Sequence, residues 1–483
     1  MSESFSFESH PVFSIFKRLN DIPRCSNRED RIAQELISIG TELELKTETD
    51  AAGNVSIVRE ADPGYEAYPR IILQGHMDMV CVKDPDSDHD FLCDPIAMVE
   101  ESGWVHAQGT TLGADNGIGL AMALALLQEN KLPSIRVLAT RSEETGMDGA
   151  IGLSEGFLDA DYLINLDSEE EGYVTCACAG GSTGRIELPV ERVVAEGKLS
   201  FLEIVLSRLH GGHSGMEIAN LRANAIKVMS SLLRSINEKQ KINLHTFSAG
   251  SKHNAIPSSA RAIISYPSEL ENDILKIINR SRDRLIESML KLEPDIQIDL
   301  FHKSTELWAI TDESKNRLFS FIELVPHGVY TMNPDNKTVE TSDNLAIVHL
   351  EEDVLTAILS VRSSSRIRLQ DLQKNISSIA EMNKGSIRFS DGYLAWELAE
   401  SSRLRNIFLE QYEQLTGERA IVLSIHAGLE CGLFAEKNPH LDMISFGPDI
   451  VGAHTTKEKV SVDSVDRSYT LLKAIIARLA TAK

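Results

Sequence analysis

The first 180 residues alternate between short apolar runs and longer amphipathic stretches. Runs at 71–73, 135–138 and 162–166 predict buried strands. Residues 28–40 have the spacing of an amphipathic helix that ends at a glycine, and residues 119–129 predict an apolar helix. Strands that alternate with helices are typical of an α/β layer, in which helices connect the strands of a largely parallel sheet.

The pattern changes near Pro189, beyond which strand-like runs are joined by long helices, and it changes back near Gly392. We expect strands at 201–207, 260–266, 345–350, 357–362, 386–390 and 443–446, and helices at 217–236, 271–292, 369–382, 402–416 and 464–482. The prediction is an α/β fold with an open, mostly parallel sheet and helices on both faces, built from residues 1–187 and 393–483. An α+β domain at 188–392 is inserted into it.

Composition narrows the class of protein. At 483 residues the chain is long for one core, so two domains are expected. The net charge of −24 argues against nucleic acids and anionic membrane surfaces as partners. Neither a signal peptide nor an apolar run of about 20 residues is evident, so we expect a cytoplasmic protein. The six cysteines include no Cys-x-x-Cys pair, which favours thiols in a reducing compartment over disulfides.

Five segments deliver side chains of the kinds that bind metals, and each follows an apolar run. They are 75–78, 113–116, 142–145, 165–168 and 452–455. Open α/β sheets bind ligands at the carboxyl ends of their strands, so these segments can converge on one rim. Imidazoles combined with carboxylates suit zinc, cobalt or manganese better than calcium or magnesium. Each segment alone has an ordinary structural explanation. Five segments in which a ligand-type side chain follows an apolar run together predict a metallohydrolase.

Two pairs within these segments indicate how such a site could be built. His76 and Asp78 lie two residues apart at a strand end and point the same way, so Asp78 can orient the imidazole. Glu143 and Glu144 project differently, so one can bind a cation while the other stays free as a general base. The alternatives are a surface His–Asp pair, a solvated acidic turn and, for Asp115, a helix N-cap.

Longer motifs around these residues resemble the M20 metallopeptidase family, and within it the bacterial aminoacyl-histidine dipeptidases. The matching stretches extend over nearly the whole chain. They are 74–80, 109–119, 143–150, 165–172, 179–181, 210–215, 253–257, 361–363 and 426–434. The resemblance implies a catalytic domain with an inserted lid domain, a pair of zinc ions that cobalt or manganese could replace, and a homodimer.

The resemblance also implies a set of metal ligands. His76, Asp115 and Asp167 would hold one zinc ion. Asp115, Glu144 and His454 would hold the other, so that the Asp115 carboxylate bridges the two ions. The Gly-Ala-His454-Thr segment departs from the more usual Pro-His-Ser surroundings, but the ligand itself is retained.

Further roles are implied for residues that do not bind the metals. Glu143 would be the general base, and Asp78 would be the partner of His76. In the lid domain, His213 would stabilise the developing oxyanion, while Asn254 and Arg362 would bind the C-terminal carboxylate of the substrate.

The implied reaction is hydrolysis of dipeptides, including Xaa-His types such as β-alanyl-histidine. Another M20 amidohydrolase, such as an aminoacylase, deacylase or tripeptidase, is the nearest alternative, and the motifs at 210–215 and 426–434 favour the dipeptidase. His426, in the second motif, receives no role. A non-catalytic binding protein is a further alternative, although every predicted ligand and Glu143 are present. No His-Glu-x-x-His motif occurs, which argues against that class of zinc protease.

Overall fold

A computed structural model describes residues 5–304, 308–334, 337–390 and 392–481. The chain divides into two compact units. Unit 1 comprises residues 1–177, 398–424 and 429–483, and unit 2 comprises residues 178–397 and 425–428. Among the described residues, no helix has both the length and the apolar character that a membrane span requires.

The boundary between the units differs from the one predicted from sequence. Strand β9 (Gly180–Pro189) pairs along its whole length with β20 (Val354–Ser363), so residues before 188 already belong to the sheet of unit 2. The short segment 425–428 also belongs to unit 2, where the Ala179 N–H donates to the Ile425 carbonyl at 3.0 Å. The predicted boundaries at 187/188 and 392/393 therefore fall inside unit 2.

The described part of unit 1 contains an eight-stranded sheet with the order β1-β2-β6-β3-β7-β23-β8-β22. The four central strands are parallel: β6 (Ile135–Thr140), β3 (Ile71–His76), β7 (Tyr162–Asn165) and β23 (Asp442–Ser445). The outer strands are β1 (Lys46–Thr49), β2 (Val55–Arg59), β8 (Tyr173–Cys178) and β22 (Ile421–Ile425). Pairs β1–β2, β2–β6 and β8–β23 are antiparallel, so the sheet is mixed where a mostly parallel one was predicted. Short turns such as that between β1 and β2 require antiparallel neighbours.

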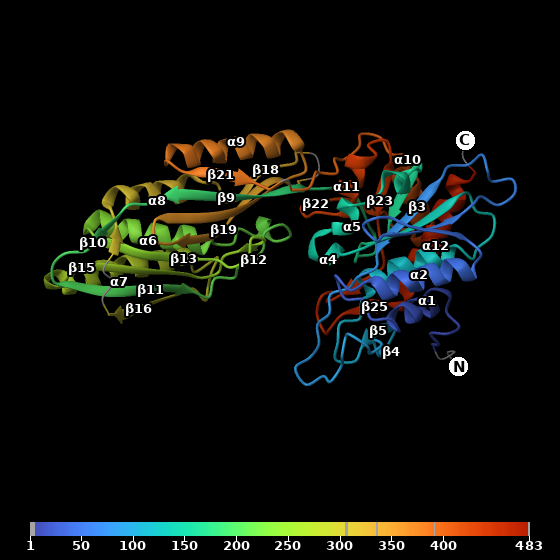
Figure 1. Cartoon of the computed structure of the whole chain (residues 1–483), viewed down its shortest axis with the longest axis horizontal. Helices are drawn as coiled ribbons and strands as arrows, with labels where there is room; N and C mark the ends of the chain where they lie inside the picture. The colour runs from blue at the N-terminus through green and yellow to red at the C-terminus, as the bar shows by residue number, and fades with distance from the viewer. Residues whose placement is uncertain (1–4, 305–307, 335–336, 391, 482–483) are drawn as a thin grey trace. The chain divides into compact units, whose positions relative to one another are not determined.

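The centre of this sheet is covered on both faces (Figure 1). All six residues of β3 are buried, and alternate side chains of a strand point to opposite faces. Helix α3 (Ala114–Leu126) packs on β3 and on α1 (Pro11–Asn20), while α2 (Asp30–Glu42) packs on β1 and β2. Helices α10 (Arg403–Thr416) and α12 (Val462–Leu479) pack on each other, and α10 also contacts β23. The mixed α/β character predicted for this region is confirmed.

A second, smaller sheet of unit 1 carries the segment with His454. Its strands are β24 (Ile450–Val451), β25 (Lys459–Ser461), β5 (Trp104–Ala107) and β4 (Met98–Glu101), in that order. Strands β24 and β25 are antiparallel, so residues 452–458 form the loop of a hairpin. The hairpin is fixed to the rest of unit 1 through the pairing of β25 with β5.

The prediction of thiols is wrong for one pair of cysteines. Cys25 and Cys81 form a disulfide that joins residues 56 positions apart. Cys25 pairs as a β-bridge with Met79, directly beyond β3, and this pairing brings the two cysteines together. Nothing in their spacing along the sequence indicates such a contact.

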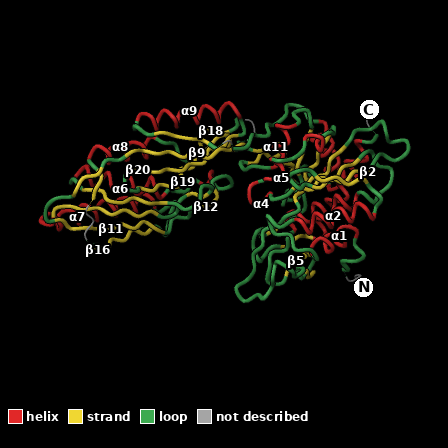
Figure 2. Tube along the Cα trace, viewed as in Figure 1, coloured by secondary structure: helices red, strands yellow, loops and turns green. Residues whose placement is uncertain are grey.

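Unit 2 is built on an antiparallel sheet with the order β16-β11-β15-β13-β19-β20-β9-β21, to which β18 adds beside β19. Strands new to this unit are β11 (Leu199–Ser207), β13 (Asn243–Ala249), β15 (Ala260–Pro267), β16 (Gln297–Lys303), β18 (Gly328–Met332), β19 (Val339–Leu350) and β21 (Ser386–Phe389). Helices α6 (Ala225–Lys239), α7 (Glu271–Met289), α8 (Asp312–Leu324) and α9 (Arg366–Met382) pack beside one another and on these strands. Figure 2 shows this layer of helices along the strands.

One predicted helix of unit 2 is shorter than expected, and several elements, among them β13, β16, β18 and α8, were not predicted. The helix expected at 217–236 begins only at Ala225, because Asn224 caps it by accepting the N–H groups of Ile226 and Lys227. Residues 218–220 form a short 3-10 turn instead. Helix α8 has no counterpart among the predicted helices. The helices expected at 271–292 and 369–382 are confirmed within a few residues.

Candidate metal centre

The predicted ligands of unit 1 lie where the parallel strands end. His76 is the last residue of β3, and Asp167 follows β7 by two residues. Glu143 and Glu144 open the short helix α4 (Glu143–Gly146) after β6. Because β6, β3 and β7 are adjacent and parallel, their carboxyl ends meet at one rim of the sheet. Asp115 reaches this rim from the start of α3 and His454 from the hairpin loop.

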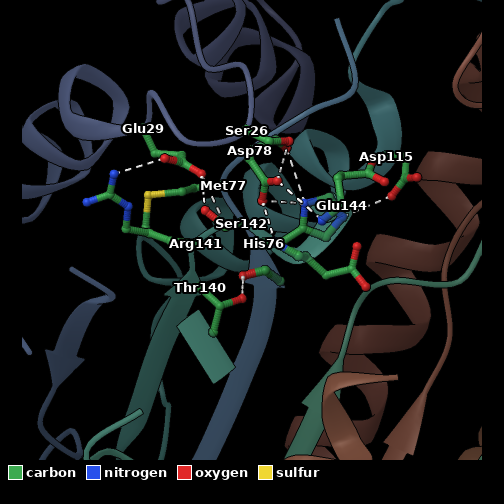
Figure 3. A network of polar contacts seen from close by, with 12 residues as sticks. Ser26, Glu29, His76, Met77, Asp78, Asp115, Thr140, Arg141, Ser142 and Glu144 are labelled. Carbon is green, nitrogen blue, oxygen red and sulfur yellow. Dashed lines mark hydrogen bonds and ion pairs between the residues drawn. The ribbon is translucent and has the colours of Figure 1, made fainter. Parts of the chain in front are cut away.

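The distances define two groups of side chains that share the carboxylate of Asp115. Figure 3 shows His76, Asp115 and Glu144 close to one another. His76 Nε2 lies 3.1 Å from Asp115 Oδ1 and 3.4 Å from Asp167 Oδ1. His454 Nε2 lies 3.0 Å from Asp115 Oδ2 and 3.0 Å from Glu144 Oε2. One oxygen of Asp115 therefore faces each histidine, and each triplet could hold a cation.

The donor set fits metal ions of the zinc type. Bonds of about 2.0–2.2 Å in a tetrahedral arrangement place neighbouring ligand atoms about 3.3–3.6 Å apart, close to the separations seen here. Imidazole and carboxylate donors in each triplet suit the same ions. The second oxygen of Glu144, Oε1, is buried and has no hydrogen-bond partner among the described residues, so it is available to a ligand. The residues present therefore fit ions of this type, and each triplet could hold one.

The charges at the rim also favour cations. Burial raises the pKa of Asp167 to about 7, and it raises the pKa of Glu143 well above its usual value. Hydrogen bonds to Asp115 and Glu144 raise the pKa of His454 to about 11. The group thus brings more carboxylates together than its two imidazoles can neutralise, and bound cations relieve that repulsion.

Asp78 holds several residues of the site in place through hydrogen bonds. Its fully buried carboxylate accepts hydrogen bonds from Glu143 N at 3.1 Å, Glu144 N at 3.3 Å and Ser26 Oγ at 2.8 Å. His76 Nδ1 lies 3.4 Å from Asp78 Oδ1 and 3.2 Å from the Asp78 carbonyl oxygen. An Nδ1–H directed at these oxygens leaves Nε2 unprotonated and facing the ligand carboxylates, which is the tautomer that binds a metal.

The geometry distinguishes Glu143 from Glu144 only in part. His76, Glu143 and Glu144 form a third group with ligand-like spacing. Glu144 makes an ion pair with His454, whereas none is recorded for Glu143 within the described residues. Their assignment as general base and ligand stays a prediction.

Sequence reasoning missed three buried charged residues around the rim. Glu430 accepts hydrogen bonds from Gln74 Nε2 at 2.6 Å and Thr140 Oγ1 at 2.9 Å, and burial raises its pKa to about 7. It stands in the 426–434 motif, which could have indicated it. Arg24 and Glu458 bond to backbone atoms near Asp115, and no sequence pattern singles them out.

Comparison with known proteins decides the family. Residues 72–478 match the model described as Peptidase family M20/M25/M40. The chain belongs to this peptidase family. The peptidase is 33% identical to the cytosol non-specific dipeptidase of Escherichia coli (strain K12), with 99% of each chain covered.

Two solved structures resemble the chain to different degrees. The crystal structure of aminoacylhistidine dipeptidase from Vibrio alginolyticus matches the peptidase with a TM-score of 0.89 and 35% identity, and 99% of each chain is covered. A tripeptidase from Staphylococcus aureus matches with a TM-score of 0.56 and 15% identity over 98% of each chain, a likeness of fold alone.

The predicted residues of unit 2 of the peptidase form a separate polar group. Strand β12 (Gly212–His213) pairs with β14 (Ala255–Ile256), which places His213 opposite Ala255. The Ser214 N–H donates to the Asn254 carbonyl at 2.9 Å, so Asn254 lies beside the same turn. Burial and then the charge of Arg362 lower the pKa of His213.

The contacts of His213 fix which ring nitrogen carries its proton. The N–H groups of Gly215 and Met216 donate to Nδ1 at 3.3 and 3.1 Å. Nδ1 is therefore an acceptor, and the neutral ring carries its proton on Nε2. His213 can thus donate a hydrogen bond through Nε2.

Two further side chains complete the polar group of unit 2. Arg362 Nη1 donates to the Tyr393 hydroxyl at 2.6 Å. On the adjoining strand, Ser342 lies opposite Arg362 in register and contacts His426 Nε2 at 2.7 Å. His426 thereby joins the group, and burial lowers its pKa to about 4. Tyr393 and Ser342 were not predicted, because neither lies in a motif that we identified.

Proposed function

We propose that this peptidase is a di-zinc dipeptidase that hydrolyses the peptide bond of dipeptides, including Xaa-His types such as β-alanyl-histidine. The proposal rests chiefly on Asp115, whose two carboxylate oxygens face His76 and His454 separately. A carboxylate between two imidazoles in this way is suited to bridging a pair of cations. The names of the E. coli and V. alginolyticus relatives support the substrate class.

The proposed ligands are His76, Asp115 and Asp167 for one ion, and Asp115, Glu144 and His454 for the other. Zinc is the proposed ion, and cobalt or manganese could replace it with the same donors. When bound, such a pair would polarise the scissile carbonyl and lower the pKa of the attacking water toward about 7.

Glu143 is proposed as the general base. It takes a proton from the attacking water and delivers it to the leaving amine, so the protein ends the cycle in its starting state. Burial raises the pKa of Glu143, and strongly shifted carboxyl groups are common among catalytic acids and bases. Asp78 holds the backbone of Glu143 and the ring of His76 in place during this exchange.

The polar group of unit 2 is proposed to recognise the substrate. Arg362 and Asn254 would bind the C-terminal carboxylate of the dipeptide, and a guanidinium fork suits that planar anion. His213 would donate its Nε2 proton to the oxyanion that develops on the scissile carbonyl. Recognition of a free carboxylate one residue beyond the scissile bond restricts the substrate to dipeptides.

The proposed location follows the E. coli relative by analogy, and the proposed assembly follows the resemblance stated for the sequence motifs. The E. coli relative is named as cytosolic, and we propose the cytoplasm for this chain as well. A homodimer is proposed, with small peptides as the partners and neither nucleic acid nor membrane among them.

The decisive experiment combines elemental analysis with a substrate panel. Purified protein should contain two zinc ions per chain and should cleave Ala-His and β-alanyl-histidine faster than a tripeptide or an N-acetyl amino acid. Faster cleavage of the tripeptide or the acetyl compound would favour another M20 amidohydrolase. Two bound ions without turnover of any compound would favour a binding protein.

The roles of Glu143 and Glu144 are tested by a matched pair of variants. Glu143→Gln should lower kcat by about 10²–10⁴-fold, the usual contribution of a general base, while two ions remain bound. Glu144→Gln should lose the second ion, because it removes a charged ligand. Loss of metal from Glu143→Gln would make Glu143 a ligand.

A further inference from the structure

Glu458 makes an unusual set of contacts in the hairpin loop that also carries His454. Its side chain is buried, and its carboxylate accepts four consecutive backbone N–H groups. Oε2 accepts from Leu112 N at 2.7 Å and Gly113 N at 2.9 Å. Oε1 accepts from Ala114 N at 2.7 Å and Asp115 N at 3.2 Å. The carboxylate thus holds the turn that leads directly into Asp115.

Arg24 holds the same turn through a carbonyl. Its buried guanidinium donates from Nη2 to the Gly113 oxygen at 2.5 Å and from Nη1 to the Asp78 oxygen at 3.1 Å. A Cβ added at Gly113 or Gly117 would overlap this guanidinium, so the two glycines provide the space that it occupies. Arg24 therefore ties the turn before Asp115 to the strand exit that carries His76.

These contacts exceed what a helix start requires. An N-cap side chain ordinarily accepts one or two N–H groups from its own first turn. Here the acceptor comes from a hairpin more than 340 residues later in the chain, and the backbone of Asp115 is not helical, with φ −81° and ψ 106°. A bridging carboxylate needs its backbone fixed, because both oxygens must be aimed at once.

We infer that Glu458 and Arg24 are positioning residues that set the Asp115 carboxylate between the two proposed cations. Glu458 also fixes the distance from His454 to Asp115, since one hairpin loop carries both the ligand and the group that holds the turn. Arg24 fixes the distance from His76 to Asp115 in the same way. This inference rests on the proposed di-metal function, and neither residue touches a cation or the substrate.

The test is Glu458→Gln in the full-length protein. A glutamine keeps the size of the side chain but has one acceptor oxygen, and its amide N–H groups oppose two of the four backbone donors. In competition with a chromophoric chelator, the wild type should bind two zinc ions, and the affinity of the variant for the second ion should fall about 10–100-fold. In cobalt-loaded protein, the magnetic coupling between the two ions should weaken with the loss of the bridge.

Glu293→Gln is the matched control. Glu293 is a buried glutamate of unit 2 that accepts the N–H groups of His210 at 2.7 Å and Ala223 at 2.9 Å. Its replacement should lower the melting temperature while both zinc affinities stay at wild-type values. If Glu458→Gln behaves as this control does, its role is structural only and the inference is overturned.

A second variant covers the case in which Glu458→Gln does not fold. Arg24→Lys keeps the charge but cannot reach the Gly113 and Asp78 carbonyls together, so it should weaken the second zinc site in the same assay. Unchanged affinity in this variant would overturn the role of Arg24. If the wild type itself binds fewer than two ions, the proposed function fails first, and the two failures are thereby distinguished.

Discussion

Replacement of Asp78 by asparagine should weaken the metal centre without touching a ligand. The carboxylate of Asp78 serves Glu143 N and His76 Nδ1 from one oxygen and Glu144 N and Ser26 Oγ from the other. An asparagine offers one acceptor oxygen and one NH2 group. In either orientation the NH2 group must face at least one of these backbone N–H donors.

The expected loss of metal affinity is worked out for the orientation of the asparagine amide that opposes fewer hydrogen-bond donors. With the amide oxygen toward Glu143 N and His76, the NH2 group can donate to Ser26 Oγ but opposes Glu144 N–H. One buried N–H without an acceptor costs about 1–3 kcal/mol. Because Glu144 is a proposed ligand, this cost should appear in metal affinity, as a loss of about 10–100-fold.

The assay is competition for zinc between the protein and a chromophoric chelator, followed by kcat in saturating metal. Asp50→Asn is the control, since Asp50 also accepts backbone N–H groups, from Ala52, Asn54 and Ser154, in a turn of unit 1. The control should lose stability but not zinc affinity. Wild-type affinity in Asp78→Asn, together with the stability loss of the control, would refute the reasoning.

Two other expectations concern stability. A Cβ at Gly119 would overlap the Leu166 carbonyl and the Asn116 amide, so Gly119→Ala should destabilise by about 1–3 kcal/mol in thermal unfolding. Gly156→Ala, which meets open space, should change little. Burial lowers the pKa of His327 from 6.5 to about 4, so between these values the unfolded chain binds a proton that the native chain does not. The free energy of unfolding should therefore fall by about 2 kcal/mol from pH 7 to pH 5. In His327→Gln, urea titrations at the two pH values should lack this decrease. The same decrease in the variant would contradict the expectation.

The parts of the site that were predictable share a local signal. His76, Glu144 and Asp167 each follow an apolar run closely, and a strand that ends in a ligand can be recognised from a few neighbouring residues. The parallel centre of the sheet then brings such strand ends together. His454 could be predicted on the same grounds, although its segment is a hairpin loop rather than the exit of a central strand.

The parts that escaped prediction depend on contacts with backbone atoms far away in the chain. Glu458 and Arg24 act on N–H and C=O groups of residues 112–115 and 78, and every sequence contains such groups. The Cys25–Cys81 disulfide likewise depends on how the N-terminal segment lies beside the exit of β3. The outer strands of the unit 1 sheet were not among the predicted runs, and apolar runs do not reveal strand direction, so the mixed character of the sheet was not predicted.

Strand β23 lies between β7 and β8 although it begins more than 260 residues after both of them in the chain. A ribosome synthesises His76, Asp115 and Asp167 long before His454. The nascent chain therefore has a gap in its sheet, and one of its two candidate ligand triplets stays incomplete, until β23 and the hairpin have been synthesised. A chain truncated before the hairpin would lack both His454 and the carboxylate of Glu458, so full metal loading reports that synthesis has passed this point.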